Sequence, residues 1–343
     1  MTLQNTNTLK KQVAEYEKST TKESVWQIIN TVVPFIALWY LAYISLSVSY
    51  WLALVPIVIA AGFLVRIFII FHDCTHHSFF KNRRINRMVG TAMGVLTLFP
   101  FDRWGNEHAI HHATSGNLDK RGTGDIWTLT VDEYLEAPLS LRLAYRFYRN
   151  PLVMFGLGPI FEFVLKNRLN RKGAKKKEKM NTYLTNVLIL ALCGMLSWLV
   201  GWQAFLLIQG SIFFLSGSVG IWLFYVQHTF EDSYFEENKD WEYVKAAVEG
   251  SSFYKLPKFF QFLTGNIGFH HVHHLSPRVP NYKLEEVHKN TPPLQNVPSI
   301  SLATSLKSLR FRLWDEKNKN FVSFKEVKAL AKKRVPVQLK PEL

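Results

Sequence analysis

The sequence predicts an all-α integral membrane protein with four transmembrane helices, arranged as two hairpins, and a cytosolic helical cap that carries three clusters of histidines. Two observations support this prediction. Apolar residues make up 48% of the 343 residues, and they are gathered into almost uncharged runs long enough to cross a bilayer. In addition, all histidines except His288 stand at or between the places where such runs end. Ionisable side chains at these positions are typical of functional sites.

The apolar runs divide the chain into five segments. The runs Trp26–Ser47 and Tyr50–Phe71 are separated by two residues, and Tyr183–Trp202 is followed directly by Gln203–Gln227. The predicted segments are a cytosolic tail (1–25), a first hairpin (26–71), a cytosolic or interfacial segment with two histidine clusters (72–181), a second hairpin (182–227) and a cytosolic segment with the third cluster (228–343).

Three shorter apolar stretches are expected to lie at the membrane surface, because they are too short to cross it. They are Val89–Phe101, Leu152–Leu165 and Phe259–Phe269. The polar first 25 residues lack the pattern of a secretory signal peptide, and residues 332–343 are expected to be disordered. The two cysteines, Cys74 and Cys193, lie in apolar surroundings and indicate free thiols rather than a disulfide.

The distribution of lysine and arginine predicts the orientation. The two hairpin turns hold neither residue, and inside the predicted spans only Arg66 is basic. Basic residues concentrate in cytoplasmic connections, so both termini and all three histidine clusters are expected on the cytoplasmic side of a bacterial membrane. The net charge of +15 follows this topology and does not indicate a nucleic-acid partner. The basic run Lys166–Lys179 fits either contact with anionic headgroups or docking of an acidic electron-transfer protein.

The spacing of the histidines predicts metal ligands. His108, His111 and His112 are related as i, i+3 and i+4, which places three imidazoles on one face of a helix. The third cluster repeats this spacing, and the first has an i, i+4 pair followed by one further histidine, so one of His76 and His77 is expected to turn away. His228 ends the fourth run on the same face. The candidate ligands are His72, His76, His77, His108, His111, His112, His228, His270, His273 and His274.

Ten imidazoles are too many for one metal ion, so two are expected. Nearly all-nitrogen ligands disfavour magnesium and calcium, and the absence of cysteine ligands disfavours a structural zinc or an iron–sulfur cluster. The sequence therefore favours two iron ions that use O2 to attack an unactivated C–H bond. His271 has no assigned role, and the isolated His288 is expected at the surface.

The ordered sequences HDCTHH, HAIHH and HVHH, the last followed by LSPRVPNY and all interleaved with two hairpins, resemble the membrane-bound fatty acid desaturases. The resemblance covers roughly residues 26–282 and is closest to bacterial acyl-lipid desaturases of the Δ5 type. It implies a non-haem di-iron centre, O2 as co-substrate and insertion of a cis double bond into acyl chains of membrane phospholipids. It also implies ligand roles for the histidines of the three clusters and for His228.

Further roles are predicted for residues near the histidines. Some members of the family carry a haem domain marked by His-Pro-Gly-Gly, which this sequence does not contain, so a ferredoxin or flavodoxin is the expected electron donor. Asp73, Glu107 and Asp125 are candidates to orient the histidine rings. Candidates to line an acyl tunnel are Trp104, Trp127, Phe269 and Tyr282.

Two alternatives remain open at this point. A fatty acyl or lipid hydroxylase or ketolase of the same superfamily would share the first hydrogen abstraction and differ only in its product. A histidine-rich metal transporter or a bis-histidine haem protein is a more distant alternative. A transporter is expected to hold its ligands near the middle of its helices, where this sequence has no histidine.

Overall fold

The computed structural model describes residues 3–334, and four of its helices are long and apolar enough to span a membrane. These are α2 (Thr21–Leu46), α3 (Tyr50–Thr75), α8 (Lys176–Val200) and the helical run Trp202–His228. The last consists of α9 (Trp202–Phe205), a π-helical turn (Leu206–Gly210) and α10 (Ser211–His228). The prediction of four spanning helices within a mostly helical protein is confirmed, and residues 335–343 lie outside the described part of the chain.

The helices extend beyond the apolar runs that predicted them. Helix α2 begins five residues before Trp26, and α3 continues past Phe71 to Thr75, so that it includes His72. Helix α8 begins at Lys176, seven residues before Tyr183. Hydropathy marks the part of a helix that fits the bilayer core, whereas backbone hydrogen bonding continues into the polar flank. This extension carries the first histidine of the first cluster on a rigid element.

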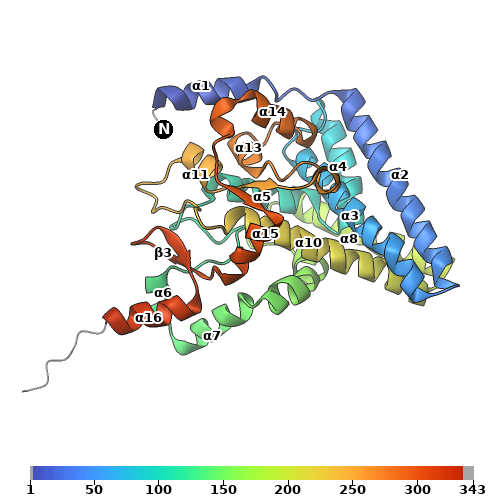
Figure 1. The fold of residues 1–343 in the computed structure, drawn as a ribbon. Helices are drawn as coiled ribbons and strands as arrows, with labels where there is room; N and C mark the ends of the chain where they lie inside the picture. The colour runs from blue at the N-terminus through green and yellow to red at the C-terminus, as the bar shows by residue number, and fades with distance from the viewer. Residues whose placement is uncertain (1–2, 335–343) are drawn as a thin grey trace, which may run out of the picture.

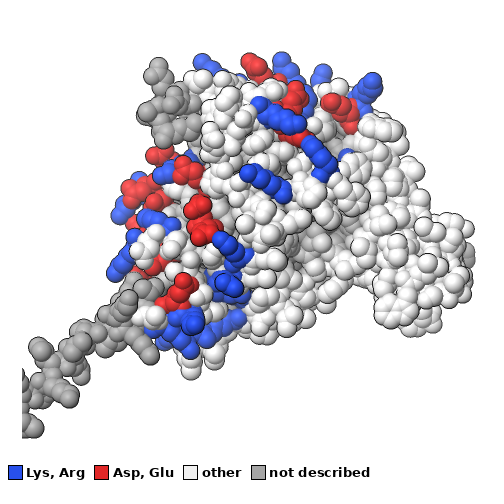
Figure 2. All heavy atoms as spheres, viewed as in Figure 1, with Lys and Arg blue, Asp and Glu red and all other residues white. Residues whose placement is uncertain are grey.

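Charged side chains avoid the hairpin ends of the spanning helices. Figure 2 shows an uncharged surface at the lower right, where Figure 1 places the tips of α2 and α3, whereas charges gather over the opposite end of the molecule. The large apolar side chains of α2 and α8 are exposed there; Trp198, for example, is 83% exposed. Lipid is the environment in which such surfaces are stable.

The single charge inside a predicted span is held by protein groups. The Arg66 guanidinium donates to the Thr31 hydroxyl at 2.9 Å and to the Phe262 carbonyl oxygen, and it stacks over the Phe262 ring at 3.9 Å. Phe262 belongs to α12 (Lys258–Leu263), which exposes Phe259 and Phe260. Arg66 therefore fixes this short aromatic helix against α2 and α3, where the sequence predicted a segment at the membrane surface.

The segment between the two hairpins folds back onto α3. It contains α4 (Arg83–Thr97), α5 (Phe101–Thr114), α6 (Val131–Glu136) and α7 (Leu139–Tyr148), followed by π-helical Val153–Leu157 and Ile160–Leu165 and the 3-10 turn Lys166–Arg168. Gly90 lets α4 approach closely, because a Cβ there would lie 2.3 Å from the Phe101 ring and 2.8 Å from the Cys74 Cβ. The turn at Leu98, with φ of 66°, then starts α5 beside the end of α3.

The C-terminal segment is built of short elements. Its helices are α11 (Tyr243–Glu249), α12, α13 (His270–Leu275), α14 (Leu284–Asn290), α15 (Leu302–Ser305) and α16 (Phe324–Arg334), with 3-10 turns at Asn281–Lys283, Pro292–Leu294 and Leu306–Arg310. Strands β1 (Phe253–Lys255) and β2 (Ser299–Ser301) pair in parallel, and β3 (Leu313–Asp315) and β4 (Asn320–Val322) pair antiparallel. These two small sheets are an addition to the all-helical prediction.

The N-terminal tail closes over the third histidine cluster. Helix α1 (Leu3–Ala14) buries Leu9 and Val13 in the same apolar core as Val272 of α13. Glu17 accepts a hydrogen bond from the Ser276 hydroxyl at 2.7 Å and forms an ion pair with Arg278 at 3.2 Å. In Figure 1, α1 lies across the cap next to α14 and α13. The N-terminal segment thus packs on the part of the C-terminal segment that carries the third histidine cluster.

Candidate metal centre

Eight of the predicted histidines form two adjacent groups at the cap end of the spanning helices. The donor nitrogens within each group lie within 4.8 Å of one another. The first group is His72, His76, His108, His112 and His273, and the second is His111, His228 and His274. The fold brings together residues that are far apart in the chain, such as His72 and His273 of the first group.

Helical spacing distributes the histidines between the groups. Helix α5 supplies His108 and His112 to the first group and His111 to the second, and α13 supplies His273 and His274 in the same way. Residues at i, i+3 and i+4 share a helix face but differ in direction, so one helix can serve two neighbouring centres. His228, at the end of α10, joins the second group, as its position at the end of the fourth span suggested.

His270 and His77 differ in position from the other eight. The Nε2 atom of His270 lies 2.9 Å from Nε2 of His228, so this ring stands beside the second group. His77 lies outside both groups: it is exposed, its φ is 58°, and its ring faces Phe101. Helix α3 ends at Thr75, His76 caps it with a right-handed backbone, and the left-handed backbone of His77 itself breaks the helical path and turns this ring outward. Of the pair that the sequence left open, His76 is therefore the one that joins the group.

Burial favours the neutral form of six of the imidazoles. It is the largest cause that lowers the pKa of His76, His108, His112, His270, His273 and His274 well below the usual value, and neighbouring histidines lower it further. A neutral imidazole has a free nitrogen lone pair, which is the form that binds a metal ion.

The ring nitrogens of the first group face one another. Nε2 of His108 lies 2.9 Å from Nε2 of His72 and 3.0 Å from Nε2 of His112. Asp73 lies 3.1 Å from Nδ1 of His72, so the proton of that ring belongs on Nδ1 and its Nε2 lone pair points into the group. Neutral imidazoles that converge in this way can direct their Nε2 lone pairs at one metal ion.

Buried ring nitrogens without hydrogen-bond partners also indicate a metal site. Nε2 of His76, His111 and His274 is buried and makes no hydrogen bond with any described residue. Such atoms are costly unless a ligand satisfies them. The all-imidazole donor set suits iron, zinc, copper or nickel rather than magnesium or calcium. The two groups therefore fit a pair of transition-metal ions.

Two of the three predicted orienting carboxylates contact histidines. Asp73 binds His72 through one oxygen, and through the other it accepts hydrogen bonds from the backbone and side-chain amides of Asn281 at 2.6 and 2.8 Å. Asp125 lies 2.5 Å from Nδ1 of His111. Glu107 does not contact a histidine, because ion pairs with Arg103 at 3.5 Å and Lys166 at 3.8 Å turn its carboxylate the other way.

One orienting group and one histidine pair near the site were not predicted from the sequence. The carbonyl oxygen of Gly250 lies 3.2 Å from Nδ1 of His228 and fixes that ring. His271, which had no assigned role, is buried, and its Nε2 lies 3.1 Å from Nδ1 of His288. His288 is thus half-buried rather than a surface residue, because α14 packs it onto α13. A main-chain carbonyl leaves no signal in residue types, so only the fold reveals it.

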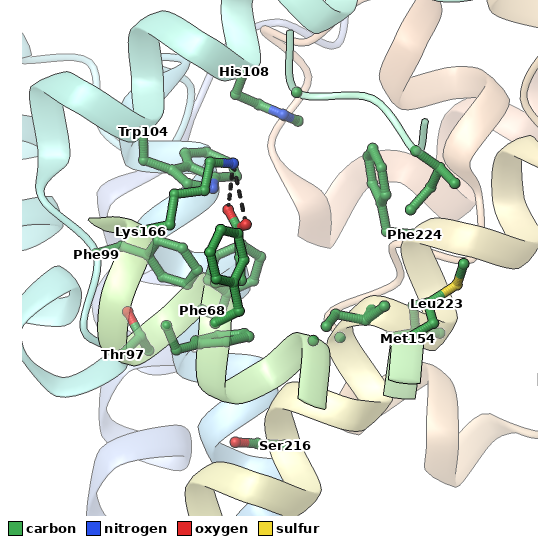
Figure 3. A pocket seen from close by; sticks show the side chains of 18 of the residues that line it. Phe68, Thr97, Phe99, Trp104, His108, Met154, Lys166, Ser216, Leu223 and Phe224 are labelled. Carbon is green, nitrogen blue, oxygen red and sulfur yellow. Dashed lines mark hydrogen bonds and ion pairs between the residues drawn. The ribbon is translucent and has the colours of Figure 1, made fainter. Parts of the chain in front are cut away.

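A largely apolar cavity of about 800 Å³ begins at the histidines. His72, His108 and His270 lie in its wall, and it follows α3 through Phe68 to Leu64. On α10 it reaches from Gln227 to Phe213, fourteen residues and therefore about 21 Å of helix. Figure 3 shows His108 at one end and Ser216 at the other, with Phe68 and Phe99 between them. The shape and lining suit a long apolar chain.

The charged residues of the cavity stand at its histidine end. Lys166 forms an ion pair with Glu162 at 2.9 Å beside Trp104, as Figure 3 shows, and Glu107 and Asp125 complete this group. The π-helical segment supplies the wall between this end and the apolar interior, through residues that include Leu157 and Phe161. Irregular helices of this kind occur frequently at functional sites.

Only one of the four predicted tunnel residues lines this cavity. Trp104 does, and its ring stacks on His108 with centroids 4.3 Å apart. The other three do not line this cavity and have other contacts. Trp127 packs on Tyr145, Phe269 stacks on Phe253, and Tyr282 accepts a hydrogen bond from the Thr20 amide. Proximity to a histidine in sequence does not give the direction of a side chain, and these three rings point into the cap.

The contrasting positions of His76 and His77 give a first prediction. His76→Ala removes a converging donor and is expected to lower the metal content of the purified protein by half or more. His77→Ala removes an exposed ring outside both groups, so the metal content is expected to equal that of the unchanged protein. Elemental analysis of both variants, with expression level as the control, measures this. Equal metal loss in the two variants would contradict the assignment.

Comparison with known proteins agrees with this arrangement. The model of the family described as fatty acid desaturase matches residues 49–301. A fatty acid desaturase of Bacillus subtilis (strain 168) is 63% identical over 334 residues, which cover 97% of this chain and 94% of the relative.

More distant relatives are named as lipid desaturases. The sn-1 oleoyl-lipid 12-desaturase of Synechocystis is 27% identical over 80% of this chain and 76% of its own length. The sn-1 acyl-lipid omega-3 desaturase (ferredoxin) of Nostoc is 27% identical over 64% of this chain and 61% of its own length. With four spanning helices, two histidine groups suited to a di-metal centre and a family match over most of its length, this chain belongs to the fatty acid desaturases.

Proposed function

We propose that this desaturase is an acyl-lipid enzyme that inserts a cis double bond into acyl chains of membrane phospholipids at a histidine-bound di-iron centre. The observation that carries the proposal is the cavity, which joins the converging histidines to the interior of the spanning helices. An acyl chain that enters it passes directly beside the proposed ligands His72, His108 and His270. The similarity to relatives named as lipid desaturases supports the lipid-bound form of the substrate.

The proposed iron ligands are the nine converging histidines. His72, His76, His108, His112 and His273 would hold one iron, and His111, His228 and His274, with His270 beside them, would hold the other. When bound, the pair would supply the activation of O2 that protein side chains cannot provide. Asp73, Asp125 and the Gly250 carbonyl hold the rings in the tautomer that directs a lone pair toward the metal.

The apolar walls of the cavity position the chain. Phe68, Phe99 and Trp104 pack in edge and tilted contacts of 5 to 6 Å next to His72 and His108, and so form a rigid apolar surface at the reacting end. A chain held against it has few conformations, which lowers the entropic cost of reaching the reactive geometry. The same walls exclude water from the reacting carbons.

Each turnover requires two electrons, for which a ferredoxin or flavodoxin is the proposed donor. One relative carries ferredoxin in its name. The excess of basic residues outside the spans supports a cytoplasmic location for both termini and for the histidines. The position of the double bond follows the likeness to enzymes of the Δ5 type and stays a prediction.

The test is expression of this chain in a bacterial host that lacks desaturases, followed by mass spectrometry of the lipids. A new double bond at one position of phospholipid acyl chains is the expected product. A hydroxyl group would instead support the hydroxylase alternative, which shares the same site. Because the chain belongs to the desaturase family, the alternative functions of metal transporter and haem protein have no support.

The hydrogen bonds of the orienting carboxylates lead to a second prediction. Asp125→Asn keeps the shape of the side chain but removes the charge that stabilises the Nδ1 proton of His111. The rate of product formation is expected to fall about 10- to 100-fold, as is typical for such partners of metal-bound histidines.

Glu107→Gln is the matched control for Asp125→Asn. Its carboxylate also lines the cavity but pairs with Arg103 and Lys166 rather than with a histidine. It is expected to retain most of the activity. The measurement is the rate of product formation in membranes, normalised to protein and metal content. A larger loss of rate in Glu107→Gln than in Asp125→Asn would refute the role of Asp125 in orienting His111.

A further inference from the structure

His77 has no part in the two histidine groups, and its surroundings suggest a different role. The ring is exposed on the turn between α3 and α4. Arg83, Arg87 and Lys177 lie close enough for their positive charges to act on it, against the single negative charge of Asp102. We call these residues, His77, Arg83, Arg87 and Lys177, the His77 surface.

The His77 surface is part of a larger excess of positive charge. Residues 81–87 contain four basic residues and no acidic one, and residues 166–179 contain eight basic residues and only Glu178. These two stretches meet because α4 packs against α8. Glu178 is buried and paired with Arg171 at 2.7 Å, and Asp102 is paired with Arg87 at 2.5 Å. Among the described residues, Arg83 and Lys177 are exposed and form no ion pair, so their charges are available to a partner.

This positive surface is adjacent to the first histidine group, because His77 directly follows His76 in the chain. His76, the residue before His77, is the one member of the two groups that is not fully buried. Its ring lies 4.9 Å from that of His108 and 4.8 Å from that of His112, measured between centroids. A protein bound at the His77 surface would therefore be separated from the first group by little more than one residue.

We propose that the His77 surface is the docking site for an acidic one-electron carrier protein and that electrons enter the metal centre past His77 and His76. The proposal rests on the proposed desaturase function, which consumes one O2, two electrons and two protons for each double bond. Two hydrogen atoms leave the acyl chain, and two water molecules form. Two reduced carrier molecules, each oxidised by one electron, supply the electrons in successive encounters.

The position of the surface favours a protein over the membrane as the occupant. Anionic headgroups would attract any basic residue near the bilayer, but they give no reason for an exposed imidazole and two unpaired cations to cover the most accessible part of the metal centre. An acidic carrier protein explains this placement, because charge complementarity raises the rate of encounter and orients the partner. The same complementarity makes the reaction sensitive to ionic strength.

The experiment uses the full-length enzyme in phosphatidylcholine nanodiscs with a reduced acidic [2Fe–2S] ferredoxin as the donor. The test variant combines Arg83→Glu with Lys177→Glu. The control is Lys317→Glu, an exposed lysine in the turn between β3 and β4, far from α4 in Figure 1. Double-bond formation is measured at limiting ferredoxin, and again with a small reductant, dithionite with methyl viologen, in its place.

The double variant is expected to lose at least tenfold in kcat/KM for ferredoxin and to keep the rate of the unchanged enzyme with the small reductant. Its metal content should be unchanged, and the control should match the unchanged enzyme throughout. Equal rates with ferredoxin would overturn the proposal. So would a loss that appears only when anionic phosphatidylglycerol is added to the nanodiscs, since the surface would then bind lipid. If the unchanged enzyme forms no double bond with either reductant, the proposed function fails instead.

Discussion

His111→Ala and His273→Ala are each expected to reduce product formation to the background of the host. Nε2 of His111 is buried without a partner in the second group, and Nε2 of His273 lies 2.9 Å from that of His112 in the first. Each substitution therefore removes a donor from a different proposed iron. Loss of one imidazole weakens the binding of that ion, because histidines supply all the donors of both groups.

The measurement is the double-bond content of lipids from a host that lacks desaturases, together with the iron content of the purified variants. His288→Ala serves as the control, because this residue is half-buried behind His271 and touches neither group. It is expected to keep most of the activity. Full activity in either His111→Ala or His273→Ala, with normal membrane insertion, would refute the di-iron assignment.

Gly220→Phe is expected to abolish desaturation of long acyl chains and to leave some activity toward shorter ones. Gly220 lines the cavity on α10, eight residues before His228, which corresponds to about 12 Å along the helix. A Cβ at this position meets no atom within 4 Å, so a side chain enters open space rather than the backbone. The phenyl ring should therefore fill the cavity between the metal centre and its far end.

The matched control for this change is Gly194→Phe. Gly194 also lies in a spanning helix and also has nothing within 4 Å of its Cβ position, but it is exposed on α8 and does not line the cavity. Competition between acyl chains of different lengths, read by mass spectrometry, measures the effect. A reduction of at least tenfold in long-chain product is expected for Gly220→Phe only. An unchanged chain-length profile would mean that the acyl chain does not occupy this cavity.

The histidine groups could be predicted from the sequence because imidazoles at helical spacing, placed at the ends of apolar runs, have few other arrangements. The four predicted spans placed His72 and His228 on one side of the membrane. The i, i+3, i+4 spacing then predicted that the histidines of the second and third clusters share a helix face. The ends of the helices were harder to predict from the sequence, because the hydropathy falls before the helix ends. The position of His77 depended on a left-handed turn that HDCTHH alone does not reveal.

Most of the residues that line the cavity could not be predicted from the sequence. Its walls are apolar residues of α3, α10 and the π-helical segment, such as Leu64 and Leu157, and each fits an ordinary membrane-facing pattern. The aromatic residues next to the histidine clusters were the visible candidates, yet three of them pack into the cap. The orientation of a ring depends on the neighbours that it meets in the fold, for example Phe253 beside Phe269. The spacing of residues therefore predicts candidate metal ligands more readily than it predicts a cavity.

Helices α5 and α13 each supply imidazoles to both groups, and this has a thermodynamic consequence for assembly of the centre. An ion in one group immobilises the two short helices on which the other group depends. The second ion then meets rings that are already ordered, and its binding costs less conformational entropy. Occupancies of the two positions are accordingly coupled, so that the half-filled enzyme is less populated than it would be with independent sites.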